Sequence, residues 1–148
     1  MSFDLTTKQL DLKARARDLA AGIIAKNAAE VDKSEQYPWE NVKALKEAGF
    51  MGMTIPTELG GPGLNFLDAN LVVEEMASYC GPTGRIAVEA NMGAISAVVH
   101  YGTETQKRLA ADLVLDGDKP AICITEPDAG SAASQMTTRA EKRGDKYI

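Results

Sequence analysis

The sequence has few of the residues that disulfide-rich and metal-binding proteins need. It holds two cysteines, Cys80 and Cys123, and a single histidine, His100, among 148 residues. The cysteines stand far apart without metal-ligand spacing, and neither a cysteine nor a second histidine stands near His100. We therefore expect buried, reduced thiols and no metal site, with a disulfide between the two cysteines as the alternative.

Long apolar runs and basic clusters are also missing. No apolar stretch approaches the roughly 20 residues that cross a bilayer, and residues 1–11 are polar and mixed in charge, unlike a signal peptide. The net charge of −5 arises from acids and bases mixed along the chain. Without a Lys/Arg cluster, nucleic acid is not an expected partner. These features favour a cytoplasmic protein with no membrane span.

What the sequence does contain is enough for a core, since 45% of its residues are hydrophobic. Apolar residues recur at helical spacing through the first 118 residues. Helices are predicted over residues 6–30, 39–48, 67–80, 83–101 and 103–115, with capping boxes at Thr6/Gln9 and Thr103/Gln106 and a helix stop at Gly49. Ile23 is placed on the buried face of the first helix, and residues 50–65 are predicted to form an ordered loop. Residues 1–118 are therefore expected to be an all-helical domain.

The pattern changes after residue 119. Ala121 to Thr125 is short, apolar and β-branched, which predicts a strand, and residues 136–140 and 146–148 flank a turn like the arms of a hairpin. The second arm has barely begun at Ile148, and a strand without its partner leaves unpaired backbone at an edge. We expect a mainly α protein in which residues 119–148 are the first strands of an incomplete β-barrel domain, poorly ordered unless another chain pairs with them.

The most informative local run is residues 125–131, Thr-Glu-Pro-Asp-Ala-Gly-Ser. It follows the predicted strand and offers two hydroxyls, main-chain N–H groups and a glycine without Cβ, so a flat polar ligand can approach closely. Composition alone favours an ordinary surface turn, because such turns are common.

This run resembles the signature segment of acyl-CoA dehydrogenases, Thr-Glu-Pro-x-Ala-Gly-Ser, which lies against FAD. The loop at residues 55–63, Ile-Pro-Thr-Glu-Leu-Gly-Gly-Pro-Gly, and a helical domain placed before the β domain are similar to that superfamily as well, so the resemblance covers essentially the whole chain. It implies an FAD-dependent enzyme that acts on a short acyl-CoA thioester. It also implies a homo-oligomer for the full-length enzyme, and electron-transfer flavoprotein as the partner of a dehydrogenase.

The resemblance assigns roles by position. It implies that Ile122 and Ile124 contact the flavin through their main chain, and that Thr125 hydrogen-bonds the ring near its N5 and O4 edge. Gly130 and Ser131 are then expected beside the pyrophosphate or ribityl group, with Ser131 also near the thioester substrate. Ile122 stands where the family often has an aromatic residue, so stacking on the ring is lost.

Arg85 is a second candidate site residue. Many acyl-CoA dehydrogenases keep small neutral residues where this chain has Gly84-Arg85-Ile86, and an arginine facing the acyl pocket favours an anionic acyl end. Together with Gln36-Tyr37-Pro38-Trp39, it resembles the branch that includes 3-sulfinopropanoyl-CoA desulfinase, which binds FAD but removes sulfite from its acyl-CoA. The alternative is a solvated arginine at a helix start.

No catalytic residue is expected in this chain, because the family's carboxylate base lies in a C-terminal helical domain. Glu75 and Glu89 are interpreted as ordinary helix acids, and His100 as a capping cation or core residue. The 148 residues alone are expected to be inactive and to bind FAD weakly or not at all. The alternative function is a stand-alone helical interaction module whose last strand joins a partner's sheet.

Overall fold

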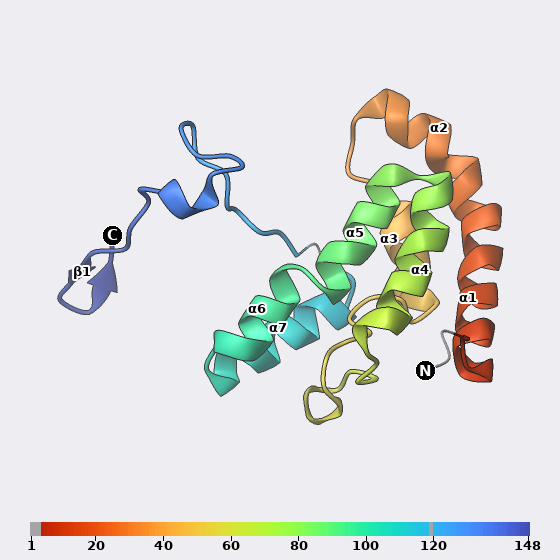
Figure 1. The fold of residues 1–148 in the computed structure, drawn as a ribbon, viewed down its shortest axis with the longest axis horizontal. Coiled ribbons are helices and arrows are strands. Elements are labelled where there is room, and N and C mark those ends of the chain that lie inside the picture. The colour runs from red at the N-terminus through yellow and green to blue at the C-terminus, as the bar shows by residue number, and fades with distance from the viewer. Residues whose placement is uncertain (1–3, 119) are drawn as a thin grey trace.

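The computed structural model describes residues 4–118 and 120–148, which form a helical body followed by an extended C-terminal segment (Figure 1). The helices of the body are α1 (Thr7–Leu19), η1 (Ala20–Ile24), α2 (Ala25–Ser34), α3 (Trp39–Glu47), η2 (Thr57–Leu59), α4 (Phe66–Tyr79), α5 (Gly81–Asn91), α6 (Ala94–Tyr101) and α7 (Glu104–Leu115). The C-terminal segment contains η3 (Ala133–Gln135), β1 (Lys142–Arg143) and β2 (Lys146–Tyr147). The mainly α fold class is confirmed.

The first three elements form one continuous rod, and its start is the predicted capping box at Thr6 and Gln9. The prediction that Ile23 is buried is wrong: its side chain is 41% exposed, whereas Ile24 is fully buried. The cause is η1, a π-helical turn in which the N–H of Ala25 donates to the carbonyl of Ala20, five residues back. The wider turn moves the buried stripe one residue along the chain.

Helices α4 and α5 lie side by side at the centre of the body, and α4 also packs against α1 (Figure 1). Their close approach depends on Gly84, because a Cβ at this position would lie 2.6 Å from the Cβ of Ala77 and 2.7 Å from its Cα. The core between these helices, α3 and the loop at residues 50–65 contains Phe50, Leu45 and Met53, which are almost fully buried.

The prediction of a single helix over residues 83–101 is wrong, because the chain turns at Met92 and Gly93 between α5 and α6. Gly93 has φ −85° and ψ −114°, outside the helical region. The carboxylate of Glu89 accepts a hydrogen bond of 3.3 Å from the N–H of Ala94, the first residue of α6. A side chain from one helix therefore satisfies a free N–H at the start of the next.

The remaining helix predictions are confirmed. Helix α3 ends before Gly49, whose φ of +75° suits glycine, and α7 begins at the predicted capping box of Thr103 and Gln106. Residues 50–65 form an ordered loop whose one helical element is η2.

The predicted strands are confirmed only in part. Residues 121–125 form no strand, because no neighbouring segment of the described chain offers them ladder hydrogen bonds. A short antiparallel pair does form around the predicted turn, where Gly144 has φ +66°. Its first strand is Lys142–Arg143 rather than residues 136–140. The predicted domain start at residue 119 lies outside the described residues.

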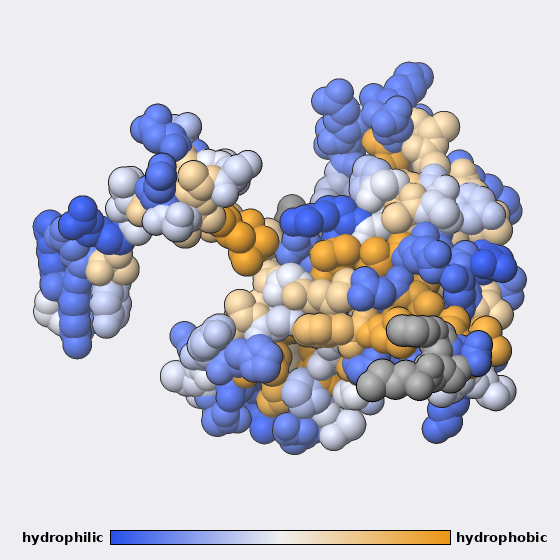
Figure 2. Space-filling model, in the orientation of Figure 1, coloured by the Kyte–Doolittle hydropathy of each residue, from blue (hydrophilic) through white to orange (hydrophobic). Residues whose placement is uncertain are grey.

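The C-terminal segment is hydrophobic only in the short stretch where it leaves the helical body, and its remainder is mostly hydrophilic (Figure 2). Ile122 and Ile124 there are 44% and 45% exposed. The expectation of two buried thiols is met by Cys80, but Cys123 is exposed, because residues 121–125 have nothing packed over them; both cysteines are free. In the described residues, no helix is long and apolar enough to cross a membrane.

Candidate functional site

The run at residues 125–131 folds into a tight turn. The N–H of Glu126 donates to the carbonyl of Ala129 at 3.1 Å, and the N–H of Ala129 donates back to the carbonyl of Glu126 at 3.2 Å. Ala129 is the only buried residue of the described segment 120–148. The turn is thus fixed by its own backbone, without a neighbouring strand.

The carboxylate of Glu126 closes a larger loop. It accepts hydrogen bonds from the N–H of Thr137 at 2.8 Å and of Thr138 at 2.7 Å, and from the hydroxyl of Thr137 at 3.2 Å. These donors, the N–H of Thr137 foremost, stabilise the charged form and lower the pKa of Glu126 to about 2. Glu126 therefore joins the two ends of residues 126–138, which we call the Glu126 loop.

The role of the Glu126 carboxylate was not predicted, because the sequence Thr-Glu-Pro indicates only a turn. A carboxylate followed eleven residues later by two threonines has no recognisable periodicity. The signal was the pair Thr137-Thr138 itself, which offers hydroxyls and N–H donors at one place.

The predicted cofactor residues lie together in sequence and at or beside this loop. Ile122, Ile124 and Thr125 lead into the turn and are exposed, and Ser131, inside the loop, is exposed as well. A Cβ added to Gly130 would meet no atom within 4 Å, so the backbone there is open to a ligand. The structure brings these five residues into one segment, which projects away from the helical body (Figure 1).

Arg85 is not part of that segment; it lies on α5. Its side chain is 67% exposed and forms an ion pair with Glu89, one turn along the same helix, whose side chain is only 12% exposed. Arg85 is therefore not buried within the described residues. Glu89 is not an ordinary helix acid, because it is buried and has two partners, Arg85 and the N–H of Ala94.

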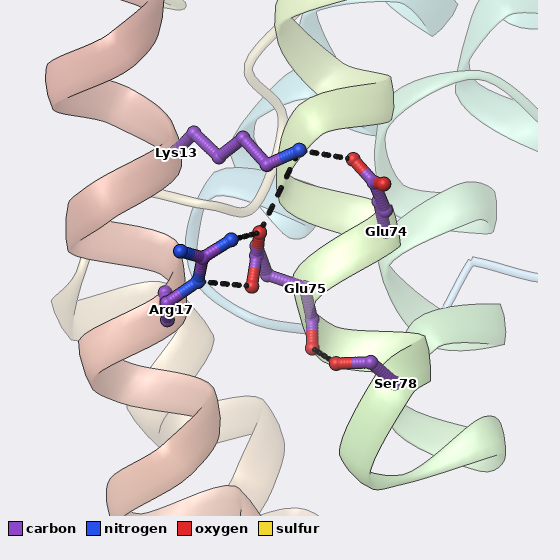
Figure 3. Close-up of polar contacts among 5 residues, drawn as sticks. All are labelled: Lys13, Arg17, Glu74, Glu75 and Ser78. Carbon is purple, nitrogen blue, oxygen red and sulfur yellow. Dashed lines mark hydrogen bonds and ion pairs between the residues drawn. The ribbon is translucent and has the colours of Figure 1, made fainter.

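Glu75 is the second acid that differs from the expected ordinary helix acid, because it is buried and paired. Its side chain on α4 is 7% exposed, and it accepts hydrogen bonds from Nε of Arg17 at 3.1 Å and Nη2 at 2.8 Å (Figure 3). Nζ of Lys13 lies 3.8 Å from the same carboxylate and 2.7 Å from Glu74. These bonds, led by that from Arg17, lower the pKa of Glu75. The group joins α1 to α4 as a paired, charged contact.

A series of hydrogen-bonded polar side chains, half-buried at Asn27 and buried at Asn41 and Thr83, joins α2, α3 and the start of α5. The amide of Asn27 donates to Oδ1 of Asn41 at 2.8 Å, and the amide of Asn41 donates to the hydroxyl of Thr83, also at 2.8 Å. Thr83 in turn donates to Sγ of Cys80 at 3.1 Å. Because each of these side chains has a hydrogen-bond partner, the series is suited to fixing the positions of the helices rather than to taking part in a reaction.

In the described ranges 4–118 and 120–148, no three His, Cys, Asp or Glu side chains gather closely enough to hold an ion. His100 is exposed near the end of α6, beside the ring of Tyr101 at 6.2 Å between centroids. This exposed position contradicts the expected core residue, and the capping role stays a prediction.

Comparison with known proteins gives a consistent result. The family model described as "Acyl-CoA dehydrogenase, N-terminal domain" matches residues 6–118. The chain is 64% identical to 3-sulfinopropanoyl-CoA desulfinase of Variovorax paradoxus, covering 99% of this chain and 37% of that protein. It is 60% identical to the enzyme of that name from Cupriavidus necator, again covering 99% of this chain and 37% of the relative.

Solved structures agree in fold. A glutaryl-coenzyme A dehydrogenase in complex with glutaryl-CoA superposes with a TM-score of 0.90 at 30% identity, covering 99% of this chain and 38% of that one. Butyryl-CoA dehydrogenase from Megasphaera elsdenii gives 0.84 at 30% identity, covering 98% and 39%. The chain thus spans less than two fifths of the length of each of these proteins.

Proposed function

Because this chain belongs to the acyl-CoA dehydrogenase family and carries its N-terminal domain, we propose that it is part of an FAD-dependent enzyme that removes sulfite from 3-sulfinopropanoyl-CoA. The observation that carries this proposal is the 64% identity to a desulfinase over 99% of the chain. Identity to the butyryl-CoA dehydrogenase is 30%. Dehydrogenation of a short acyl-CoA at its α and β carbons is the second candidate.

The proposed division of the chain follows the expected boundary. Residues 1–118 are a helical domain, and residues 119–148 begin a middle β domain. The family model's end at residue 118 supports this boundary, as does the change from packed helices to the exposed segment that follows. No residue of this chain is assigned as the catalytic base.

The residues at and beside the Glu126 loop fit a flavin in their chemistry. The Thr125 hydroxyl can bond the polar edge of the ring, Ser131 can bond the ribityl or pyrophosphate group, and Gly130 leaves the backbone open for close approach. Ile122 and Ile124 supply main-chain groups on the extended segment that leads into the turn. FAD, when bound, supplies the redox chemistry of such enzymes. What this chain contributes is a turn held in place before the cofactor binds.

Arg85 is the proposed substrate-binding residue. A guanidinium offers a planar fork to a sulfinate or carboxylate at the far end of the acyl group, and its place on α5 keeps it apart from the flavin turn. Ser131 is proposed to lie near the thioester end. A short acyl chain lying between Arg85 and Ser131 would place its anionic end at Arg85 and its thioester end at Ser131.

The test uses the full-length enzyme that contains this chain. Arg85→Ala is expected to lower kcat/KM for the anionic acyl-CoA by about 10- to 100-fold, because a charge-assisted pair is lost while the exposed position is partly screened. Arg85→Lys keeps the charge but loses the fork, so its loss should be smaller. A neutral short acyl-CoA should be affected much less. Equal losses on both substrates would make Arg85 structural.

The remaining parts of the proposal concern the whole protein. We expect a cytoplasmic homo-oligomer, with electron-transfer flavoprotein as a partner if the enzyme is a dehydrogenase. The flavin absorbance and intact mass of the purified full-length protein test whether it is a flavoprotein that extends beyond this chain, and its mass in solution tests the oligomeric state. A colourless protein that binds no FAD would favour the alternative, a helical interaction module that adds a strand to a partner's sheet.

A further inference from the structure

Glu89 and its surroundings carry an inference about how Arg85 acts. We propose that Glu89 is a positioning residue that holds the guanidinium of Arg85 in place for the anionic end of the acyl group. This inference rests on the proposed function of Arg85 and adds a specificity role for a second residue, which does not itself touch substrate.

The two oxygens of the Glu89 carboxylate have different tasks. Oε1 pairs with Nη2 of Arg85, one helical turn earlier, and Oε2 accepts the N–H of Ala94 at 3.3 Å. The carboxylate is thereby attached to the turn between α5 and α6 on one side and to the guanidinium on the other. Because both ends are held, the position of Arg85 is coupled to that turn.

Gly93 provides the space for this arrangement. A Cβ at position 93 would overlap Oε2 of Glu89 and lie 2.8 Å from its carboxyl carbon. Any side chain at this position would displace the carboxylate. The sequence Glu89-Ala-Asn-Met-Gly93-Ala94 therefore contains the acid, the space it fills and the N–H that it caps within six residues.

Burial separates this pair from an ordinary surface ion pair. Lys43 and Glu47 on α3 have the same spacing, but their side chains are 75% and 66% exposed. The side chain of Glu89 is 12% exposed, so most of the pair's contact with solvent is through its arginine partner. An unpaired arginine would sample many rotamers, and ordering it on binding has an entropic cost. Five donors allow one edge to pair with Glu89 while others remain for a ligand.

The experiment measures binding of two acyl-CoA probes to the full-length enzyme by calorimetry: succinyl-CoA, with a terminal carboxylate, and neutral butyryl-CoA. Glu89→Gln is the informative variant, because its amide oxygen can still accept the N–H of Ala94 while the charge that holds Arg85 is lost. We expect Glu89→Gln to weaken the binding of succinyl-CoA by about 2- to 10-fold, because the guanidinium must then be ordered when the ligand binds. The binding of butyryl-CoA should change little. Glu47→Gln, with the same spacing in an exposed pair, should change neither.

A double-mutant cycle distinguishes positioning from a purely structural role. If Glu89 acts through Arg85, Glu89→Gln should cause no further loss of succinyl-CoA affinity in the Arg85→Ala background. Equal losses in both backgrounds, or no loss in the single variant, would overturn the inference while leaving the role of Arg85 intact. If Arg85→Ala itself failed to discriminate between the two probes, the proposed function of Arg85 and the inference would both fall.

Discussion

The helical body and the C-terminal segment are stabilised in different ways. In residues 4–118, helices bury a shared core, and buried polar side chains such as Asn41 and Asn91 have hydrogen-bond partners. In residues 120–148 nearly every side chain is exposed, and order comes from the Glu126 loop and one short hairpin. The comparison shows that the body carries its own packing, whereas the segment is organised by local hydrogen bonds alone.

Removing a polar anchor of the body should have the largest effect. Asn91 is fully buried and binds the carbonyls of Phe50 and Ala87 and the N–H of Met53. Asn91→Ala leaves these groups without their partner, so the free energy of unfolding should fall by roughly 2–5 kcal/mol. Unfolding in denaturant measures this change in the free energy of unfolding. Asn70→Ala, at an exposed position of α4, is the control, and similar losses in both would contradict an anchoring role.

The close approach of α4 and α5 gives the next prediction. Gly84→Ala places a methyl group against Ala77, where backbone must shift, and should cost about 1–3 kcal/mol. Gly81→Ala, three residues earlier on α5, meets no atom within 4 Å. It should be neutral or slightly stabilising, because alanine favours helix. If the melting temperatures of the two variants fell by the same amount, the close contact between Gly84 and Ala77 would not be what makes alanine unfavourable at position 84.

Acid should weaken the contact between α1 and α4. Because the pKa of Glu75 is lowered in the folded protein, its charge stabilises the fold at pH values above the ordinary glutamate pKa of 4.5. This stabilisation is lost as the pH falls through the lowered pKa of the folded state. Glu75→Gln should therefore be less stable than wild type at pH 7, with a gap that narrows below pH 4.5. Thermal unfolding across this range measures the gap. Glu74→Gln, at a 64% exposed position beside it, should show little gap, and a pH-independent gap for Glu75→Gln would contradict the prediction.

The smallest effect on global stability is expected for Glu126→Gln, since the Glu126 loop is remote from the core. Its effect should be local: the amides of Thr137 and Thr138 lose a charged acceptor and should exchange with solvent faster. Since the pKa of Glu126 is about 2, wild-type protection should persist at pH 4 and fade as the pH approaches 2. Hydrogen exchange read by NMR tests this, and unchanged exchange in the variant would show that the loop closes without Glu126.

Much of the body could be predicted from sequence because its signals are local. Capping boxes, helical periodicity and the glycine after α3 depend on residues within a few positions of each other, and all are confirmed. The wrong predictions lie where a distant contact or an unusual turn determines the structure. The π turn buries Ile24 instead of Ile23, and the turn at Gly93 divides one predicted helix into two. The strand at residues 121–125 was predicted from composition, but a strand requires a neighbour.

The candidate site was predictable in identity but not in arrangement. The resemblance located Thr125, Gly130 and Ser131, and their roles toward a flavin stay predictions. It could not show that Glu126 closes the loop that contains Gly130 and Ser131, or that the carboxylate of Glu89 accepts the N–H of Ala94 at the start of α6. Both acids act through partners that a single sequence does not reveal, one across eleven residues and the other across a break between helices.

The π turn at residues 20–24 has a consequence for how this domain tolerates changes in chain length. Insertions and deletions usually accumulate in loops, but a π turn accommodates an additional residue within a helix. Deleting one residue there, for example Gly22, would allow a regular α-helix whose flanking turns keep their faces, because the π turn has absorbed one residue. Arg17 could then still face Glu75 while Asn27 faces Asn41. A one-residue gap at this position in an alignment of relatives would mark proteins with a regular first helix that docks with the same face.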